Sequence, residues 1–225
     1  TTGAPVLAPL ASPTFTGVPA APTATLGTDT TQIATTAFVL ANAGSSPSFG
    51  FTSGYYYRGL GSPSSSVTPV LNTTSFMPFV MSETKTFDRL AIVTGTSYVG
   101  TGAVRMGIYN NDSTTGKPST VVLDAGTVAT TAANTIYEIT ISQSLSAGAY
   151  WIAFNMQTAP ATPRFQGISA TASNIGYEIN TAGFVAYQNA GNWSEASISG
   201  AFATAGTLTP SASNTAGATC TLRVT

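Results

Sequence analysis

Short segments of apolar residues, alternating in places with polar ones, follow one another along the chain from Phe51 onward. They are rich in Val, Ile, Thr and aromatic residues, and Gly, Pro, Asn and Ser separate them, which favours β-strands. The pattern predicts strands at 74–82, 85–95, 103–110, 119–128, 134–142, 148–157, 163–170, 174–180, 183–189, 197–204 and 217–225. Because no helical period interrupts them, we expect a mainly β protein, an antiparallel β-sandwich that is jelly-roll-like. The final segment predicts a strand that is joined into the sheet.

The first 44 residues follow a different pattern. Five prolines fix φ and remove hydrogen-bond donors, so we expect residues 1–27 to be extended chain with turns. Asp29 and Gln32 then have the spacing of a capping box, which predicts a helix of about 13 residues. Gly44 supplies the stop signal for this helix.

The predicted helix has a narrow apolar stripe at the helical period, made by Ile33, Ala37, Phe38 and Ala41. So short a helix gains most of its stability from packing. No neighbouring segment offers a matching helix, so we expect these residues to pack against other copies of the chain. A Gly, Ser and Pro cluster at 45–50 predicts a linker. The expected organisation is therefore a stem at 1–44, a linker at 45–50 and a β-sandwich domain at 51–225.

Charged residues make up only 7% of the chain, and the net charge is −1. An ordinary soluble domain has about 25%, and no basic patch is present that would predict binding to nucleic acid or anionic lipid. No apolar window of about 18 residues occurs, so we expect a soluble chain without membrane insertion.

The chain has no histidine and one cysteine. These two facts remove the usual zinc sites and the histidine-dependent nucleophile systems. We expect Cys220 to be a small buried strand residue and Trp151 to lie in the core.

Few segments suggest other chemistry. The glycines at 100–107 lack the spacing of a dinucleotide fingerprint. Asn110, Asn111 and Asp112 could offer calcium ligands, but with one carboxylate they look more like an Asx-rich hairpin turn. We therefore expect no cofactor and no metal.

Glycosidases need two carboxylates, and no pair stands out in the sequence. Glu83 and Asp88 flank a strand entry, Glu138 alternates with apolar neighbours as an outward residue would, and Glu195 lies in a predicted loop. A solvated surface position is the preferred interpretation for each, and a hidden pair remains an alternative.

Aromatic residues are the more suggestive group. Three tyrosines run together at 55–57, so at least one must point away from the core in any strand register. Exposed rings beside amides suit a sugar-binding surface, because an apolar sugar face stacks on the ring. The candidate receptor-binding residues are Tyr55, Tyr56, Tyr57, Tyr187, Asn192 and Trp193. The alternative is that these rings cover a sheet edge or a subunit contact.

Within residues 12–39 the sequences SPTFTG, VPAAPTA and GTDTTQIATTAFV occur in fixed order. This stretch resembles a segment of tail-fibre and receptor-binding proteins of tailed bacteriophages. Residues 104–128 and 138–154 are similar to β-sandwich modules of phage tail proteins and bacterial surface proteins, without site residues that could be transferred.

The resemblance implies a homotrimeric fibre whose distal domain contacts a glycan or an outer-membrane component of the host. It also implies a location in the virion, at the distal part of the tail fibre, with other tail or baseplate proteins bound through an upstream region. On this interpretation the protein is not an enzyme. Two alternatives stay open: a structural connector without a receptor site, and a depolymerase that cleaves surface polysaccharide.

Overall fold

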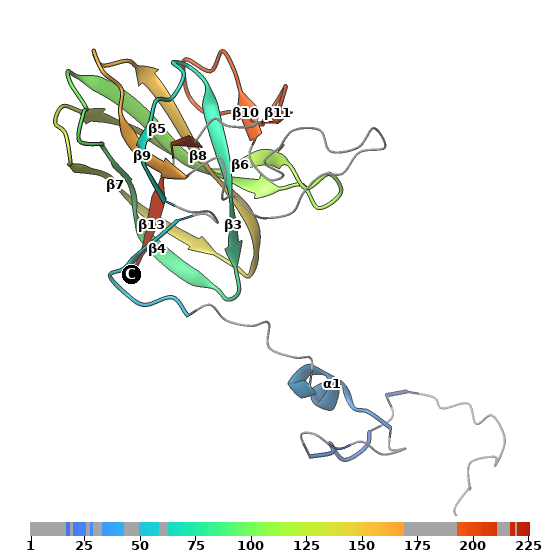
Figure 1. Ribbon diagram of the computed structural model, residues 1–225. Helices are drawn as coiled ribbons and strands as arrows, with labels where there is room; N and C mark the ends of the chain where they lie inside the picture. The colour runs from blue at the N-terminus through green and yellow to red at the C-terminus, as the bar shows by residue number, and fades with distance from the viewer. Residues whose placement is uncertain are drawn as a thin grey trace, which may run out of the picture. The chain divides into compact units, whose positions relative to one another are not determined.

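The computed structural model describes residues 17–18, 20–25, 28, 33–42, 50–58, 63–168, 193–210, 217–218 and 220–225 (Figure 1). The chain divides into two compact units, Thr1–Ser46 and Pro47–Thr225. The division falls within the segment 45–50, which the sequence predicted as a linker. The strands predicted at 174–180 and 183–189 lie outside the described residues.

The first unit contains one helix, α1 (Thr36–Asn42). Thr35 is its N-cap, because its Oγ1 accepts a hydrogen bond from the Phe38 N–H at 3.1 Å. Residues 33–35 are not helical, so the predicted length of about 13 residues is wrong. Threonines and Ile33 precede the helix, and such β-branched residues extend a helix poorly while a Thr hydroxyl caps it well.

The shorter helix also shortens the predicted apolar stripe. Ile33 precedes the helix with 80% of its surface exposed. Ala37 is exposed and Phe38 half-buried. Ala41 lies in the helix, but its side chain is outside the described part, as are Asp29, Gln32 and Gly44.

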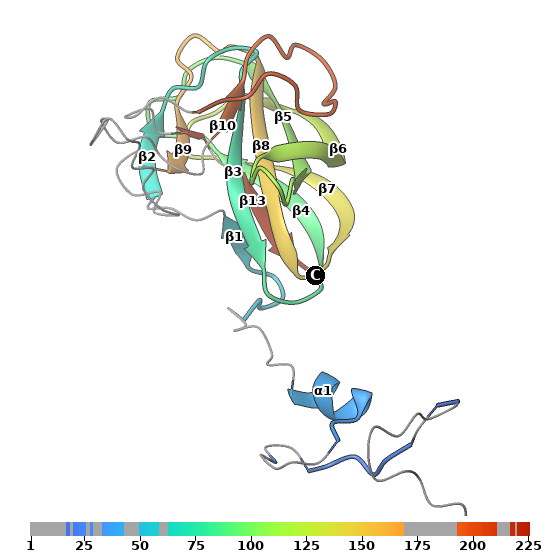
Figure 2. The ribbon, with the colours of Figure 1, turned by 90° about the vertical axis from the view of Figure 1, so that its right-hand side faces the viewer.

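The second unit is mainly β, with antiparallel sheets that are consistent with a β-sandwich. One sheet has the order β1 (Tyr56–Arg58), β13 (Thr221–Val224), β4 (Lys85–Val93), β7 (Ile136–Leu145). A second sheet has the order β11 (Thr209–Pro210), β10 (Trp193–Glu195), β3 (Thr74–Met81), β8 (Gly148–Thr158), β5 (Gly102–Asn111), β6 (Pro118–Thr130). A third sheet has the order β12 (Gly217–Ala218), β9 (Phe165–Ile168), β2 (Pro63–Val67). Figure 2 shows β2 and β9 side by side.

The main core lies between the four-stranded and the six-stranded sheet. Leu90 and Leu222 from the first sheet and Ile108 and Phe154 from the second are each at most 1% exposed and belong to one apolar cluster. Cys220 is buried in the same cluster, as predicted, and burial raises the pKa of its thiol. The predicted C-terminal strand is confirmed, since β13 pairs with β1 on one side and with β4 on the other.

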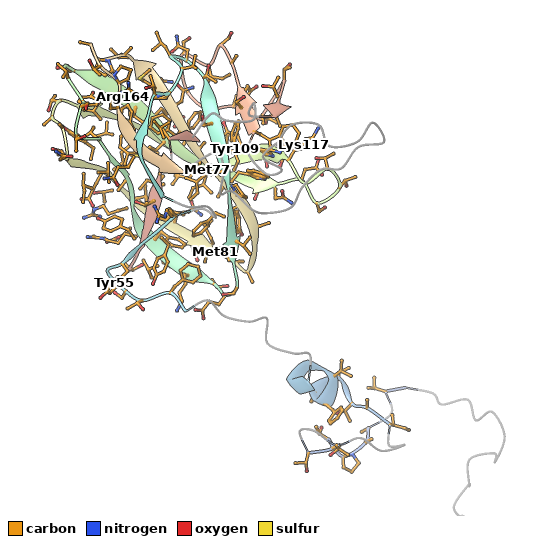
Figure 3. All side chains as sticks on the ribbon, viewed as in Figure 1. Tyr55, Met77, Met81, Tyr109, Lys117 and Arg164 are labelled. Carbon is orange, nitrogen blue, oxygen red and sulfur yellow. The ribbon has the colours of Figure 1, made fainter. Side chains whose placement is uncertain are left out.

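A second apolar cluster lies on the other face of the six-stranded sheet. It contains Phe76, Tyr109, Trp151 and Phe202, and Figure 3 labels Tyr109 within it. The core position predicted for Trp151 is confirmed at 4% exposure. Its indole N–H donates to Asn111 Oδ1 at 2.9 Å, which satisfies the polar atom of a buried ring.

The strand predicted at 197–204 is wrong, because this segment has no ladder pairing. Its backbone is held by separate hydrogen bonds instead: the Ile198 N–H donates to the Asn72 carbonyl at 2.8 Å, the Phe202 N–H donates to Asp124 Oδ2 at 3.0 Å, and Asn155 Nδ2 donates to the Ile198 carbonyl at 3.0 Å. Gln157 Nε2 likewise donates to the Gly200 carbonyl. The apolar residues therefore cover the second cluster without forming a strand.

Candidate functional site

Six polar and aromatic side chains gather on the outer face of the four-stranded sheet. Side chains alternate between the two faces of a strand, and Tyr57, Leu90 and Leu222 face the core. A register shift between Phe87 and Arg89 is a β-bulge, which turns two successive side chains outward. We call the resulting group the tyrosine–arginine face, and it consists of Tyr56, Arg58, Asp88, Arg89, Glu138 and Arg223.

Asp88 holds the centre of this face. Arg223 donates to both of its carboxylate oxygens, Nε to Oδ1 at 2.9 Å and Nη2 to Oδ2 at 2.6 Å, and Arg89 Nη1 lies 3.7 Å from Oδ2. The hydrogen bond from Arg223 lowers the pKa of Asp88 below its ordinary value, and the same bond raises the pKa of Arg223. Such fork-shaped pairing fixes both side chains in one geometry.

Tyr56 is held flat across the sheet. Its ring lies 5.8 Å from the Arg223 guanidinium carbon, and its hydroxyl donates to Glu138 Oε1. Ala91 is opposite Glu138 in the β4–β7 register and is 1% exposed, although it alternates with core residues. Side chains of the face therefore cover it. The ring of Tyr56 keeps 37% of its surface exposed.

The other two tyrosines of the run differ from Tyr56. Tyr55 is 65% exposed, so the prediction that at least one ring points outward is confirmed. Tyr57 packs on the core, with its ring centroid 4.8 Å from that of Phe51. Of the three, Tyr55 and Tyr56 are exposed to a ligand, whereas Tyr57 packs on the core side of the strand.

Arg58 is the unpaired charge of this face. It is exposed, and within the described part of the chain its side chain takes part in no ion pair or hydrogen bond. Sequence reasoning did not single out Arg58 or Arg223. The signal for Arg58 was present, because it follows Tyr56 by two residues and a strand places such residues on one face.

Trp193 forms a second candidate site elsewhere on the domain. It begins β10, pairing with Phe76 on one side and Pro210 on the other, so the loop expected around Trp193 and Glu195 is wrong. The Lys117 ammonium lies 4.5 Å from the ring centroid, and the ring packs on the second apolar cluster. Figure 3 shows Lys117 and Tyr55 on different sides of the domain. Tyr187 and Asn192 lie outside the described residues.

The segment with the candidate calcium ligands forms the turn between β5 and β6. Asp112 Oδ1 accepts from the N–H groups of Thr114 at 2.8 Å and Thr115 at 3.2 Å. These bonds lower the pKa of Asp112, and they make the Asx turn that the sequence favoured. Asn111 Oδ1 is committed to Trp151.

Other acidic residues in the described part of the chain have separate partners. Asp124 accepts from Arg105 Nη1 at both carboxylate oxygens, at 2.8 and 2.7 Å, and Glu195 Oε1 accepts from the Gly206 N–H at 2.7 Å. Glu138 is exposed between half-buried neighbours, as its alternation predicted. Among the described residues no group of three or more acidic, cysteine or histidine side chains could hold a metal ion, and no described helix is long and apolar enough to cross a membrane.

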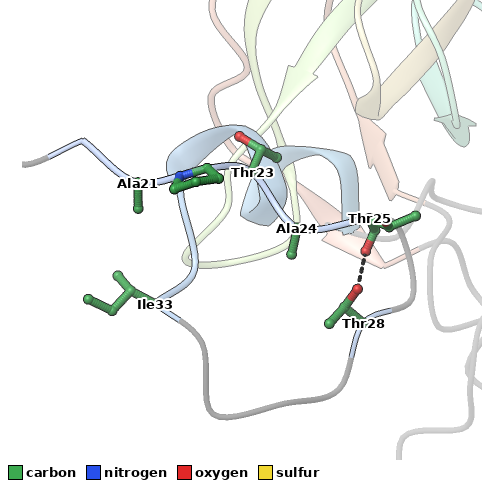
Figure 4. A pocket seen from close by; sticks show the side chains of 7 residues that line it. Ala21, Thr23, Ala24, Thr25, Thr28 and Ile33 are labelled. Atoms are coloured by element: carbon green, nitrogen blue, oxygen red, sulfur yellow. Dashed lines mark hydrogen bonds between the residues drawn. The ribbon is translucent and has the colours of Figure 1, made fainter.

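A pocket in the first unit is lined by methyl and hydroxyl groups rather than by ionisable ones (Figure 4). The Thr28 hydroxyl donates to the Thr25 carbonyl at 2.7 Å on its wall, and Ile33 reaches it from the other side. Its other lining residues are Ala21, Pro22, Thr23 and Ala24. This lining suits packing rather than catalysis.

Comparison of the chain with protein-family models, with curated proteins and with solved structures gives no match in any of the three.

Proposed function

We propose that the chain is the receptor-binding end of a bacteriophage tail fibre, whose second unit attaches the virion to the surface of a bacterial host. The observation that carries the proposal is the order SPTFTG, VPAAPTA, GTDTTQIATTAFV within residues 12–39. Three matching parts in fixed order over so short a stretch are a specific signal. The proposal includes a jelly-roll-like head, an extended stem with one short helix, and a homotrimer that joins other tail or baseplate proteins upstream.

The surface chemistry of the second unit supports an adhesive role. A protein with 7% charged residues has a weak long-range field, so recognition depends on direct contacts. Tyr55 and Tyr56 are exposed, and the ring of Tyr56 lies beside the Arg223 guanidinium; such surfaces can stack on sugars and bind their hydroxyls. A glycan or an outer-membrane component is therefore the proposed receptor.

Repetition would compensate for weak single contacts. Three heads on one fibre bind as a unit, because the first contact raises the effective concentration of the others. Overall avidity can then exceed a single affinity by about 10² to 10⁴ without any new contact. Adhesion by such contacts needs no bond breaking.

A cell-binding assay tests this function. Fluorescently labelled full-length protein is incubated with a panel of bacterial strains that differ in surface polysaccharide, each paired with a mutant that lacks this polysaccharide. We expect the label on at least one parent strain and its loss on the paired mutant. Binding to no strain would contradict adhesion and favour the structural connector.

The same material separates adhesion from depolymerisation. Purified polysaccharide from a bound strain is incubated with the protein, and new reducing ends are measured over time. We expect none above the background. A steady increase in reducing ends would show a depolymerase and would make the search for a carboxylate pair the next step.

A further inference from the structure

We propose that the tyrosine–arginine face binds a sugar that carries a carboxylate, with Arg58 as the cation and the ring of Tyr56 as the platform. This inference rests on the proposed function, because it names the chemical class of the glycan. It goes beyond that function in assigning the contact to one strand, β1.

The strand β1 places the side chains of Tyr56 and Arg58 where one ligand can contact both. Tyr56 and Arg58 are two residues apart on one strand and share a face. Their Cα atoms are thus separated by about 6.6 Å, at about 3.3 Å per residue. That spacing is close to the length of a pyranose ring with its carboxylate. Among the described strands β1 is also the edge of its sheet, and Tyr56 and Arg58 are both exposed.

The tyrosine–arginine face has one more arginine than it has carboxylates. Its three arginines oppose two carboxylates. Asp88 is taken by Arg223 and Arg89, while Glu138 accepts from Tyr56. Arg58 is exposed and lacks an ion pair in the described part of the chain. The face is therefore locally positive in a chain whose net charge is −1, which favours an anionic ligand at this place.

The chemistry of the two groups indicates a carboxylated sugar. A guanidinium presents a planar fork that matches a carboxylate in a bidentate pair. The ring of Tyr56 is fixed by Arg223 on one side and by Glu138 at its hydroxyl, so little ordering cost remains when a ligand stacks on it. A uronic acid offers both in one sugar unit: an apolar ring face that can stack on Tyr56 and a carboxylate that can pair with Arg58.

The test uses polysaccharide purified from a strain that binds the full-length protein. Affinity is measured before and after the uronic carboxylates are reduced to alcohols, for wild type, Arg58→Ala, Arg58→Lys and Tyr56→Ala. Lys85→Ala is the matched control, because it removes one positive charge outside the face. We expect carboxyl reduction to weaken wild-type binding by about tenfold or more, the range of a hydrogen bond to a charged group.

The variants should then show that Arg58 and the carboxylate act as one pair. R58A should bind the native polysaccharide about tenfold or more weakly than wild type does, and carboxyl reduction should not weaken its binding further. R58K should lose less affinity than R58A. K85A should bind both polymers like wild type. Y56A should weaken binding to both polymers, because stacking does not need the charge. The comparison of the two polymers with wild-type protein needs no variant, so it holds even if a variant fails to fold.

Four results would overturn the inference. Equal binding of the native and the reduced polymer would exclude the carboxylate as the bound group. Binding that persists after reduction and is lost when phosphate groups are removed would show that the face binds a different anion. An unchanged affinity of folded R58A would exclude Arg58 while leaving adhesion intact. A protein that binds no strain at all overturns both the inference and the proposed function, so the two failures are distinguishable.

Discussion

Asp88 is the central carboxylate of the tyrosine–arginine face. The contribution of its charge to stability can be tested by varying the pH. Its pKa is lowered from the ordinary value of 3.8, chiefly by the hydrogen bond from Arg223. A carboxyl group with a depressed pKa stabilises the fold above its unfolded pKa and loses this contribution as pH falls through the folded pKa. Asp88→Asn should therefore be less stable than wild type at about pH 6, and the difference should shrink below about pH 3.8.

Chemical denaturation at a series of pH values measures this difference. Arg223→Gln should show the same pH dependence, because it removes the same hydrogen bonds from the other side. A stability difference between wild type and D88N that stays constant with pH would mean that the shape of the side chain matters and its charge does not.

Gly107 shows how close the packing is between β5 and the segment that covers it. A Cβ at this position would lie 2.6 Å from the Leu123 carbonyl oxygen and 2.7 Å from the ring of Phe202. Overpacking of this kind costs about 1–3 kcal/mol, so Gly107→Ala should lower the free energy of unfolding by that amount. Gly200→Ala is the control, because nothing lies within 4 Å of its Cβ position. Chemical denaturation measures both variants, and equal denaturation midpoints would contradict the close contact at Gly107.

At the scale of elements, the segment 196–206 is attached by side chains and by two separate backbone hydrogen bonds, from the Ile198 and Ala205 amides, rather than by a ladder. Phe202 is 8% exposed and lies 5.7 Å from the ring of Tyr109. Removing a buried ring costs about 3–5 kcal/mol where the structure cannot relax, but this segment can open locally. Phe202→Ala should therefore speed hydrogen exchange of the Ile198 and Ala205 amides by about tenfold or more.

The exchange experiment distinguishes local opening from global unfolding. Amides of β8 should keep their wild-type protection in F202A, and Ser199→Ala should behave like wild type because Ser199 is exposed. Equal acceleration in β8 would mean that the segment is part of the main cooperative unit.

The helix α1 depends on its N-cap. Thr35 Oγ1 accepts from the Phe38 N–H at 3.1 Å, and replacement of such a cap by Ala costs about 1 kcal/mol. Thr35→Ala should increase the exchange rate of the Val39 amide, which donates to the Thr35 carbonyl, whereas Thr35→Ser should preserve it. Unchanged exchange in T35A would show that packing, rather than the cap, holds the first turn.

The main strands could be predicted from the sequence because their signal is local. The segments that became β3, β4, β5, β6 and β8 have apolar runs bounded by turn residues, and each strand lies within two residues of its prediction. The segment 197–204 has the same composition, but its backbone partners are Asp124, Asn155 and Gln157. No local pattern reveals partners so distant in sequence.

The candidate site was predictable only in part for the same reason. Tyr55 and Tyr56 could be proposed because a run of three rings cannot all be buried in a strand. Arg223 joins them only through the pairing of β1 with β13, a contact between residues at opposite ends of the domain. The helix was predicted too long, because the capping preference of Thr35 competed with that of Asp29.

At the scale of the whole molecule, the chain concentrates its few charges. It has seven basic and eight acidic residues, and five of them lie on the tyrosine–arginine face. Charges are sparse along the rest of the chain, which limits steering by long-range fields. Specificity in the proposed adhesive role would then arise from a small number of contacts, multiplied by the number of heads in the assembly.

The proposed trimer can be tested in the full chain through the exposed apolar residues of the first unit. Ile33 is 80% exposed and Val39 55% exposed, and a short helix with such residues gains stability only when a partner covers them. Ile33→Asp should convert a trimer into monomers in sedimentation equilibrium, because burying an unpaired carboxylate at the contact is costly. Ala34→Asp, at an exposed neighbouring position, should leave the trimer intact. A monomeric wild type would contradict the proposed stem, and a trimer that survives I33D would place the contact between copies in the second unit instead.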